Sequence, residues 1–265
     1  MLDEVELRSK KTRAKKEPVQ EEKSDIRLKY SIAELPSNGK LGYSNHVEYR
    51  DILVRDEKEL ASSTEKTFQK TLNSILKSLL KDGSYYDSLS IYDRDYLLLW
   101  IWANNYSTEK NIEATCPHCG HKNNYVIDLT ALEVTELSED FKNPYPFTLS
   151  NGTEVTLRLI TVGDEEIARK YCAVNKEEEE YQVMLALSVN FGAVMPLVDK
   201  IKRINDTFTG KDMAFIRGFH TFFRYGVVDK VEKECSNCSE VSSYTVPFQA
   251  DFVLPTLSSS FGKTI

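Results

Sequence analysis

Residues 93–129 have the sequence DRDYLLLWIWANNYSTEKNIEATCPHCGHKNNYVIDL, which contains the two strongest structural signals in the chain. Its first part is apolar on nearly all sides after Asp93, which predicts a helix buried in a core. Its second part places a Cys-x-x-Cys sequence between two segments that predict strands. We call the turn that contains the two cysteines a knuckle. The stretch therefore predicts a buried helix followed by strand, knuckle and strand.

The same stretch occurs again after a shift of 119 residues. Residues 212–248, DMAFIRGFHTFFRYGVVDKVEKECSNCSEVSSYTVPF, align with it without a gap, and both the Asp93/Asp212 pair and the Cys-x-x-Cys sequences coincide. Nearer the start, SNG at 37–39 recurs at 150–152, and YRDILVRDEKE resembles LRLITVGDEEI. We interpret these matches as an internal duplication. They predict an α+β fold of two pseudo-repeated halves, each with strands and helices and ending in a strand-knuckle-strand unit.

The composition divides the chain into segments. The N-terminal residues alternate basic and acidic runs with almost no aromatic side chains, so they cannot bury enough surface to offset the entropy of ordering. Pro144 and Pro146 mark a boundary where we expect no regular element. The predicted segments are a disordered charged arm (1–28), a first half with the first knuckle (29–131), a linker (132–146), a second half with the second knuckle (147–251) and a C-terminal tail (252–265).

Local patterns predict the early elements of the first half. Residues 47–54, VEYRDILV, are rich in β-branched side chains and predict a strand. Apolar residues at helical spacing then predict an amphipathic helix that begins after Ser63 or Thr64 and ends before Gly83.

In the second half, four glutamates, Glu177–Glu180, precede an amphipathic helical region. Acidic side chains stabilise a helix N-terminus, so we favour that role over cation binding. We expect the helical region to be interrupted near Gly192 and Pro196.

The cysteine pairs are compatible with two kinds of chemistry. CPHC, residues 116–119, is by itself the active-site sequence of thiol oxidases, which place the first cysteine at the start of a helix. Here the following residues predict a turn and a strand, and an oxidase needs no second pair. Structural zinc takes four ligands in a tetrahedron, so the second pair completes a site. We therefore predict one structural zinc ion per chain, in a split zinc-ribbon-like site formed by Cys116, Cys119, Cys235 and Cys238.

Two alternatives remain open for these cysteines. Ordinary zinc ribbons place their pairs about 15–20 residues apart, whereas here a whole half intervenes, so the pairs could be reduced thiols without metal. They could also serve thiol-disulfide exchange at Cys116 and Cys119, which would require a reactive, low-pKa Cys116.

The remaining candidate ligands and nucleophiles have structural interpretations. His118 and His121 flank the first knuckle, but the duplication places Asn237 and Glu240 opposite them, so we interpret them as turn residues. Cys172 is predicted to be a small buried apolar group. His220 lies among phenylalanines and is predicted to be a core histidine. The chain contains no G-x-x-x-x-G-K-[ST], G-x-G-x-x-G, G-x-S-x-G or H-E-x-x-H sequence, and we expect a protein that is not an enzyme.

Charge and hydropathy restrict partners and location. The formal net charge of −7 argues against nucleic-acid binding, which depends on neutralising phosphates. The alternative is a zinc-ribbon nucleic-acid binder that uses the basic cluster Arg8–Lys16. The first residues lack the apolar core of a signal peptide, and the longest apolar run is too short to span a membrane, so we expect a cytoplasmic protein.

Four motifs resemble a known family. LPSNG near the start, the acidic RDEKEL, the apolar DRDYLLLWIWANNYS and the knuckle ATCPHCGHKNNYVIDL together resemble the T-even-like phage baseplate family. Members of this family are described as baseplate hub subunits or hub assembly chaperones of contractile tails. The resemblance covers about residues 30–250 and is strongest over 93–131. This chain departs from the familiar pattern in its charged arm and in its second knuckle, CSNCSE, which lacks a glycine after the second cysteine.

The resemblance implies a non-enzymatic protein in the cytoplasm of the infected bacterial host. It implies that the protein helps tail hub components to assemble, and that its partners are hub, baseplate or tape-measure-associated proteins. It does not decide the oligomeric state or whether the protein remains in the mature virion.

Overall fold

The computed structural model of the chain describes residues 28–246. The basic cluster Arg8–Lys16 and the tail 252–265 lie outside the described residues. Within 28–246 the fold is mixed α+β, as predicted, with seven α-helices and small antiparallel sheets. None of the helices in this range combines the length and the apolar character needed to cross a membrane.

The first half begins with an antiparallel strand pair and continues with three helices and a hairpin. Its elements are β1 (Tyr30–Glu34), β2 (His46–Arg50), α1 (Val54–Ala61), α2 (Glu65–Leu79), α3 (Ile91–Asn105), β3 (Glu109–Thr115) and β4 (Lys122–Asp128). Short 3-10 turns lie before α3, at Tyr86–Ser88, and after β4, at Leu129–Ala131.

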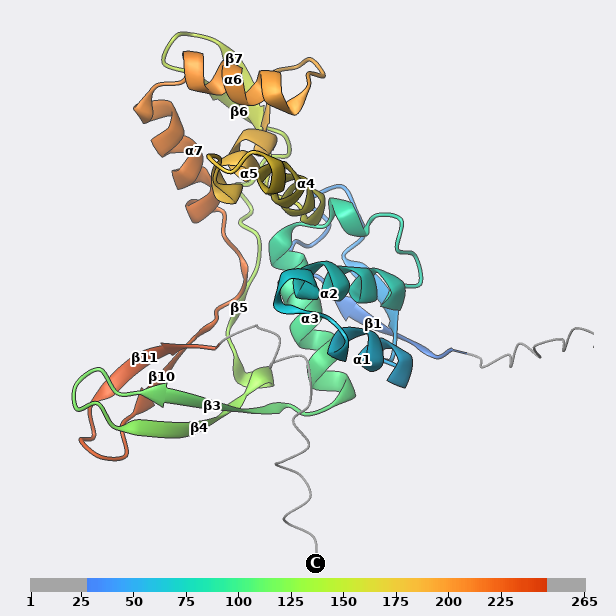
Figure 1. The fold of residues 1–265 in the computed structure, drawn as a ribbon, viewed down its shortest axis with the longest axis vertical. Helices are drawn as coiled ribbons and strands as arrows, with labels where there is room; N and C mark the ends of the chain where they lie inside the picture. Colours follow the sequence, from blue (N-terminus) through green and yellow to red (C-terminus); the bar gives the residue numbers. More distant parts are fainter. Residues whose placement is uncertain (1–27, 247–265) are drawn as a thin grey trace, which may run out of the picture.

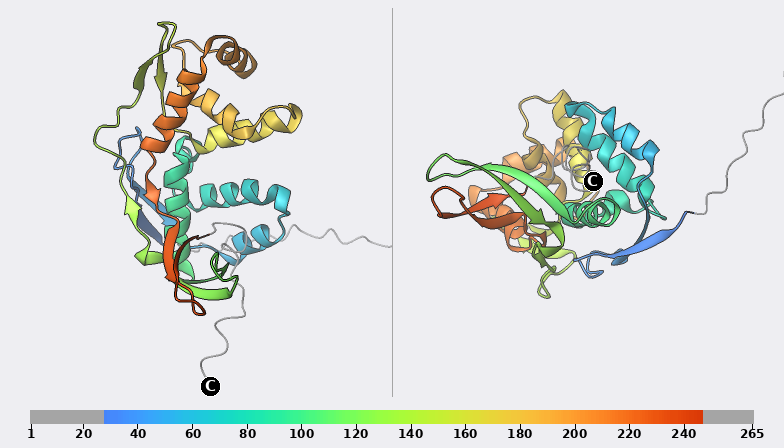
Figure 2. Two further views of the ribbon diagram at one scale, coloured as in Figure 1. Left: turned by 90° about the vertical axis from the view of Figure 1, so that its left-hand side faces the viewer. Right: turned by 90° about the horizontal axis from the view of Figure 1, so that it is seen from below.

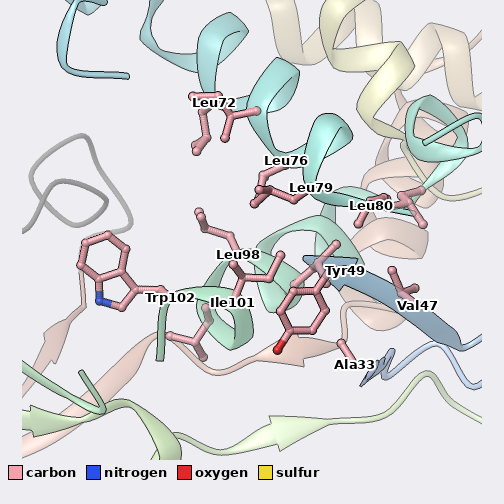
Figure 3. Packing of buried hydrophobic residues seen from close by; sticks show 14 of the residues in the cluster. Ala33, Val47, Tyr49, Leu72, Leu76, Leu79, Leu80, Leu98, Ile101 and Trp102 are labelled. Atoms are coloured by element: carbon pink, nitrogen blue, oxygen red, sulfur yellow. The ribbon is translucent and has the colours of Figure 1, made fainter. Parts of the chain in front are cut away.

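The first core lies between α2, α3 and the β1–β2 pair. Apolar residues of α2 recur at helical spacing and face Leu98 and Ile101 of α3, as Figure 3 shows for Leu72, Leu76 and Leu79. The helix α2 begins after Thr64, in agreement with the sequence prediction. Burial of this apolar face stabilises α2 more than its intrinsic helix propensity does.

The second half begins with a three-stranded antiparallel sheet and adds four helices. Its elements are β6 (Tyr145–Thr148), β7 (Glu154–Leu157), α4 (Val162–Val174), α5 (Glu180–Ser188), β8 (Val189–Asn190), α6 (Leu197–Thr207), α7 (Gly210–Phe222), β9 (Gly226–Val227), β10 (Lys230–Glu234) and β11 (Val241–Thr245). The second core lies between this sheet, α5 and α7, and a third, smaller core lies between α4, α5 and α6.

The second hairpin packs on the first half. The chain leaves α7, runs through β9, and reaches β10–β11 beside β3–β4, at the end of the molecule opposite α6 (Figures 1 and 2). Val227, Val231 and Val246 of this segment pack in the first core. The linker contributes a short strand, β5 (Val134–Thr135), which pairs with β9. The first core therefore contains residues from both ends of the described chain.

Polar contacts join the two halves near the start of α3. The Arg94 guanidinium donates to Glu165 of α4 at 2.8 Å, and the Arg94 side chain is buried. Ser90 forms a β-bridge with Thr161, and its hydroxyl accepts a hydrogen bond from the Tyr225 hydroxyl at 2.8 Å. A buried ion pair is costly to break from one side, so these contacts fix how the halves meet.

Each half uses an aspartate in the first turn of its apolar helix to bind the SNG turn. In the first half the Ser37 N–H donates to Asp93 at 3.3 Å, and in the second half the Ser150 N–H donates to Asp212 at 2.8 Å. Both aspartates occupy the third position of their helices and are buried. The two SNG sequences thus lie at equivalent places in the two halves.

A second pair of contacts also recurs. Arg50 pairs with Asp56 through both terminal guanidinium nitrogens, and Arg158 pairs with Asp164 in the same way. Each aspartate also accepts the N–H of the residue three positions before it. These residues lie in the YRDILVRDEKE and LRLITVGDEEI sequences.

Two expectations for individual elements were wrong. The strand predicted at 47–54 ends at Arg50, and Val54 instead begins α1, because Asp56 binds the Leu53 N–H and starts a helix there. Pro146 lies within β6, although we expected prolines to exclude a regular element. An edge strand tolerates proline, since one side of it makes no sheet hydrogen bonds, and β6 is the edge of its sheet.

Candidate metal centre

The first knuckle lies at the turn of the β3–β4 hairpin. The strands pair in register up to Thr115 and Lys122, and residues 116–121 form the turn. The Cys116 N–H donates to the His121 carbonyl at 2.8 Å, and the Gly120 N–H donates to the Cys116 carbonyl at 2.9 Å. Gly120 has a φ of 72°, a left-handed conformation that glycine adopts without steric cost.

The second knuckle makes the same turn between β10 and β11. The Cys235 N–H donates to the Glu240 carbonyl at 3.0 Å, and the Ser239 N–H donates to the Cys235 carbonyl at 2.9 Å. Ser239 takes the place of the glycine and has a φ of 60°. The missing glycine noted in the sequence therefore leaves the hydrogen bonds of the turn unchanged.

The two knuckles bring four cysteine sulfurs into one cluster. The Cys116 and Cys238 sulfurs are 3.7 Å apart, the Cys119 and Cys235 sulfurs are also 3.7 Å apart, and all four lie within 4.8 Å of one another. A tetrahedral zinc site with Zn–S bonds of about 2.3 Å has sulfur–sulfur edges of roughly 3.8 Å. Two of the six sulfur–sulfur distances therefore match this edge, and the four cysteines could hold a metal ion.

The 3.7 Å sulfur contacts run between the two knuckles and not within one Cys-x-x-Cys sequence. All five cysteines are free. The residues after Cys119 lead into β4, so neither Cys116 nor Cys119 lies at the start of a helix. The helix dipole that activates a thiol oxidase cysteine is missing here.

Amide groups around the sulfurs provide further contacts. The Asn123 side-chain amide donates to the Cys235 sulfur at 3.5 Å, and its carbonyl oxygen accepts the Ser236 N–H at 3.0 Å. The Asn237 side-chain amide donates to the Cys119 sulfur at 3.5 Å. Such contacts orient metal ligands and stabilise their charge. Sequence reasoning missed Asn123, which is buried and reaches across to the other knuckle.

These hydrogen bonds also shift the thiol pKa values. The backbone N–H groups of Asn237 and Cys238 lower the pKa of Cys235 to about 6. The Asn237 side chain lowers the pKa of Cys119. The Glu240 N–H favours the Cys238 thiolate, but burial and the neighbouring thiols outweigh it and raise the pKa of Cys238 to about 12. Four thiolates cannot coexist at this distance without a cation to offset their charge.

Tyrosines hold the two hairpins together behind the cluster. The rings of Tyr125 and Tyr244 are 5.3 Å apart, and the Tyr125 hydroxyl donates to the Glu234 carbonyl at 3.1 Å. Ile112 is opposite Tyr125 in the first hairpin, and Val231 is opposite Tyr244 in the second. The hairpins therefore contact each other through corresponding positions.

The other candidate residues lie outside the cluster. His118 and His121 are exposed turn residues, as predicted. Cys172 is buried in the third core, which agrees with the prediction of a small apolar group. His220 is buried, and its Nε2 lies 3.0 Å from the Ser188 hydroxyl, which agrees with a core histidine.

The acidic run also behaves as predicted. Glu180 is the first residue of α5, and Glu179 occupies the N-cap position without a side-chain hydrogen bond to the helix, so Glu177–Glu180 lie at a helix N-terminus.

Comparison with known proteins identifies the family. Residues 27–253 match the family described as T4 bacteriophage base plate protein. No curated protein matches the chain, and no solved structure does. The match covers most of the chain, including both knuckles and all of the described residues. The chain therefore belongs to the T4 bacteriophage base plate protein family.

Proposed function

We propose that Cys116, Cys119, Cys235 and Cys238 bind one structural zinc ion per chain, in a zinc-ribbon-like site split between the halves. The proposal depends mainly on the two 3.7 Å sulfur distances between the knuckles, which match the edge of a tetrahedral thiolate site. Zinc would neutralise the thiolates and would join two segments that are far apart in sequence. Closing so long a loop can contribute strongly to folding.

We also propose that the two halves arose by duplication. The SNG turns bound by Asp93 and Asp212 support this origin, as do the two Arg–Asp pairs and the two knuckle turns. On this proposal the metal site lies on a pseudo-twofold axis between equivalent hairpins.

Elemental analysis of the purified full chain tests the metal. We expect one zinc per chain, and we expect its loss in a Cys235→Ser variant together with a large loss of stability. Cys172→Ser is the matched control, because Cys172 is buried outside the cluster and should leave zinc content unchanged. A metal-free wild-type protein that is as stable as Cys235→Ser would refute the site.

We propose that the protein has no catalytic role and acts in baseplate assembly in the cytoplasm of the infected host. Family membership is the observation that supports this function most strongly. A body joined by a metal site is a rigid platform, which suits protein binding. We propose hub, baseplate or tape-measure-associated proteins as its partners.

Affinity purification of the tagged full chain from infected cells tests the partners. We expect hub or other baseplate proteins to co-purify, and we expect phage lacking the protein to produce incomplete baseplates. Partners confined to replication or transcription proteins would contradict the assembly role. Cys172→Ser should co-purify with the same partners as wild type, whereas loss of partners only in Cys235→Ser would show that binding needs the metal site.

A further inference from the structure

Helix α7 carries an apolar stripe that faces away from the second core. Phe215, Gly218 and Phe222 follow one another at the i, i+3, i+7 spacing and therefore share one face of the helix. Phe215 is 43% exposed and Phe222 is 72% exposed. Figure 1 shows α7 at the outer edge of the second half. We refer to these three residues as the α7 stripe.

The two rings of the stripe are supported from behind. Phe215 stacks on Phe147 of β6 with ring centroids 4.1 Å apart, and Phe222 contacts the buried Phe223 edge-on at 4.9 Å. Gly218 lies between the rings, and a Cβ atom added there would meet nothing within 4 Å. Glycine lowers the stability of a helix interior relative to alanine. The stripe therefore offers two supported aromatic rings with open space between them, at a cost to the helix itself.

The equivalent face of α3 in the first half is covered. The shift of 119 residues aligns the α7 stripe with Tyr96, Leu99 and Ala103. Leu99 is only 5% exposed, and Leu129 and Leu132, which follow the first hairpin, lie beside it in the first core. The second hairpin instead leaves α7 for the first core, so within the described chain the stripe keeps its exposure. On the proposed duplication, the stripe is a core face that has lost its cover.

The exposed charges of α7 are positive. Lys211 lies one turn before Phe215, Arg217 lies beside Gly218, and the single acidic residue of the helix, Asp212, is buried. In the part of the chain that the structure describes, neither Lys211 nor Arg217 makes an ion pair. A complementary segment therefore carries acidic side chains next to apolar ones. A second copy packed symmetrically on the stripe would bring the cations of both copies to one interface, which like-charge repulsion disfavours.

We propose that the α7 stripe binds an amphipathic helix of another baseplate protein, with apolar residues at helical spacing and acidic residues beside them. This rests on the proposed function, which supplies baseplate proteins as partners. The i, i+3, i+7 spacing of the stripe is the seam along which two helices pack. From Phe215 to Phe222 the stripe is roughly 10 Å long, so about two turns of the partner helix cover it. An apolar side chain of that helix occupies the space at Gly218, and its carboxylates pair with Lys211 and Arg217.

Photocrosslinking at the stripe identifies the occupant. Phe222 is replaced by p-benzoylphenylalanine in the full chain, produced in infected cells, and the crosslinked peptide is sequenced by mass spectrometry. Val174, which is 82% exposed at the end of α4, takes the same replacement as the control. We expect a peptide of another baseplate protein with the proposed apolar and acidic pattern. Crosslinks to the same chain, to a second isotope-labelled copy or to nucleic acid would overturn the proposal, as would a pattern equal to that of the control.

Titration of the purified full chain with the crosslinked peptide, synthesised with a fluorophore, measures each contribution. We expect Phe222→Ser to weaken binding about tenfold or more, whereas Val174→Ser should leave it unchanged. Arg217→Glu should weaken binding about fivefold and Arg217→Lys should preserve it. Added salt should reduce the difference between wild type and Arg217→Glu, because it screens exposed charges. Wild-type affinity in Phe222→Ser or in Arg217→Glu would refute the stripe as the binding site.

Two further measurements separate the possible failures. Phe222 and Arg217 are exposed, so their variants should keep the zinc content and the unfolding midpoint of wild type. If Phe222→Ser loses stability, the exposed charge change Arg217→Glu still tests the surface. If wild type purifies with baseplate proteins and both stripe variants retain all of them, the stripe is refuted while the assembly role stands. If wild type purifies without baseplate proteins, the assembly role fails and the stripe proposal fails with it.

Discussion

The two knuckles make the same turn from different residues. Gly120 adopts the left-handed conformation in the first knuckle and Ser239 adopts it in the second, while His121 and Glu240 supply equivalent carbonyls. Only the cysteines are identical in the two turns. The two turns therefore share their backbone path and the direction of their thiols, and these two features set the sulfur positions.

The hairpins differ more in how they connect to their helices. In the first half β3 follows α3 after three residues, whereas in the second half an extended segment with β9 separates α7 from β10. That segment carries the second hairpin away from α7 and onto the first core (Figure 1). The two knuckles make equivalent turns, and they meet because the segment between α7 and β10 follows a different path from the segment between α3 and β3.

The largest expected loss of stability comes from replacing one cysteine ligand in each knuckle in turn. If both supply zinc ligands equally, Cys116→Ser and Cys238→Ser should each lose the metal and destabilise the fold by on the order of 5 kcal/mol or more. Chemical denaturation with zinc analysis of each variant measures both quantities. Retention of zinc by only one of the two variants would show that the knuckles are not equivalent.

The next largest expected loss of stability comes from removing the arginine of either Arg–Asp pair, and the two losses should differ. The Arg50 side chain is only 4% exposed, whereas that of Arg158 is 39% exposed. Arg50→Ala leaves Asp56 charged and buried and should cost about 3–5 kcal/mol, whereas water can reach Asp164 in Arg158→Ala, which should cost about 1–3 kcal/mol. Urea unfolding of both variants tests this order. Equal losses would mean that the two pairs are equally shielded from solvent.

The two first-turn aspartates should respond to acid in opposite directions. Burial disfavours the Asp212 carboxylate, but hydrogen bonds from Thr209 and Ser150 outweigh it and lower the pKa to about 2. Burial raises the pKa of Asp93 despite its hydrogen bonds from Tyr43 and Ser37. Asp212 therefore contributes stability above about pH 4 that is lost as the pH falls towards 2. Asp93 behaves in the opposite way, because its protonation at low pH removes the cost of burying a charged carboxylate.

Asparagine variants measure this difference. Asp212→Asn should cost about 1–2 kcal/mol at pH 7, and its cost should shrink towards pH 2. The cost of Asp93→Asn should instead grow as the pH falls, because the wild-type carboxyl becomes neutral. Comparing each variant with wild type at each pH cancels shared effects, including acid release of metal from thiolates. Parallel pH profiles for the two variants would contradict the assignment.

The smallest expected change in stability comes from exchanging the residues at the left-handed position of the two knuckle turns. Ser239→Gly relieves a left-handed serine and should stabilise the protein by about 0.5–1 kcal/mol, whereas Gly120→Ser should destabilise it by about 1 kcal/mol. Thermal unfolding at constant zinc concentration measures both. A loss of stability in Ser239→Gly would show that the serine contributes something beyond its backbone conformation.

The cysteine cluster was predictable because its signal repeats. Two Cys-x-x-Cys sequences at one shift, each between strand patterns, lead to four sulfurs at one place. The helix α2 was predictable for a similar reason, since its apolar spacing is regular over fifteen residues. These features depend on local pattern and on simple ligand geometry.

The remaining features depend on tertiary contacts. Nothing near Asn123 in the sequence indicates that it reaches Cys235, because the contact exists only when the hairpins meet. The position of β9 beside α3 was not predictable either. A strand of two residues is too short to show a periodic apolar pattern. A local signal did exist for α1, because Asp56 follows Leu53 at the spacing at which Asp164 follows Thr161. That signal was outweighed by the β-branched run before it.

The pairing of β5 with β9 makes the body formed by residues 136–225 a topological insertion. The chain leaves at Thr135 and returns at Gly226, which are register partners and so about 5 Å apart. A tight turn joining these two residues would excise the second core and the helices α4–α7 while keeping both hairpins, all four cysteines and most of the first core. The metal centre and the first core would then be one continuous unit, and the removed body would be an insertion that enters and leaves through the β5–β9 pair and also contacts this unit through Arg94–Glu165 and Ser90–Thr161.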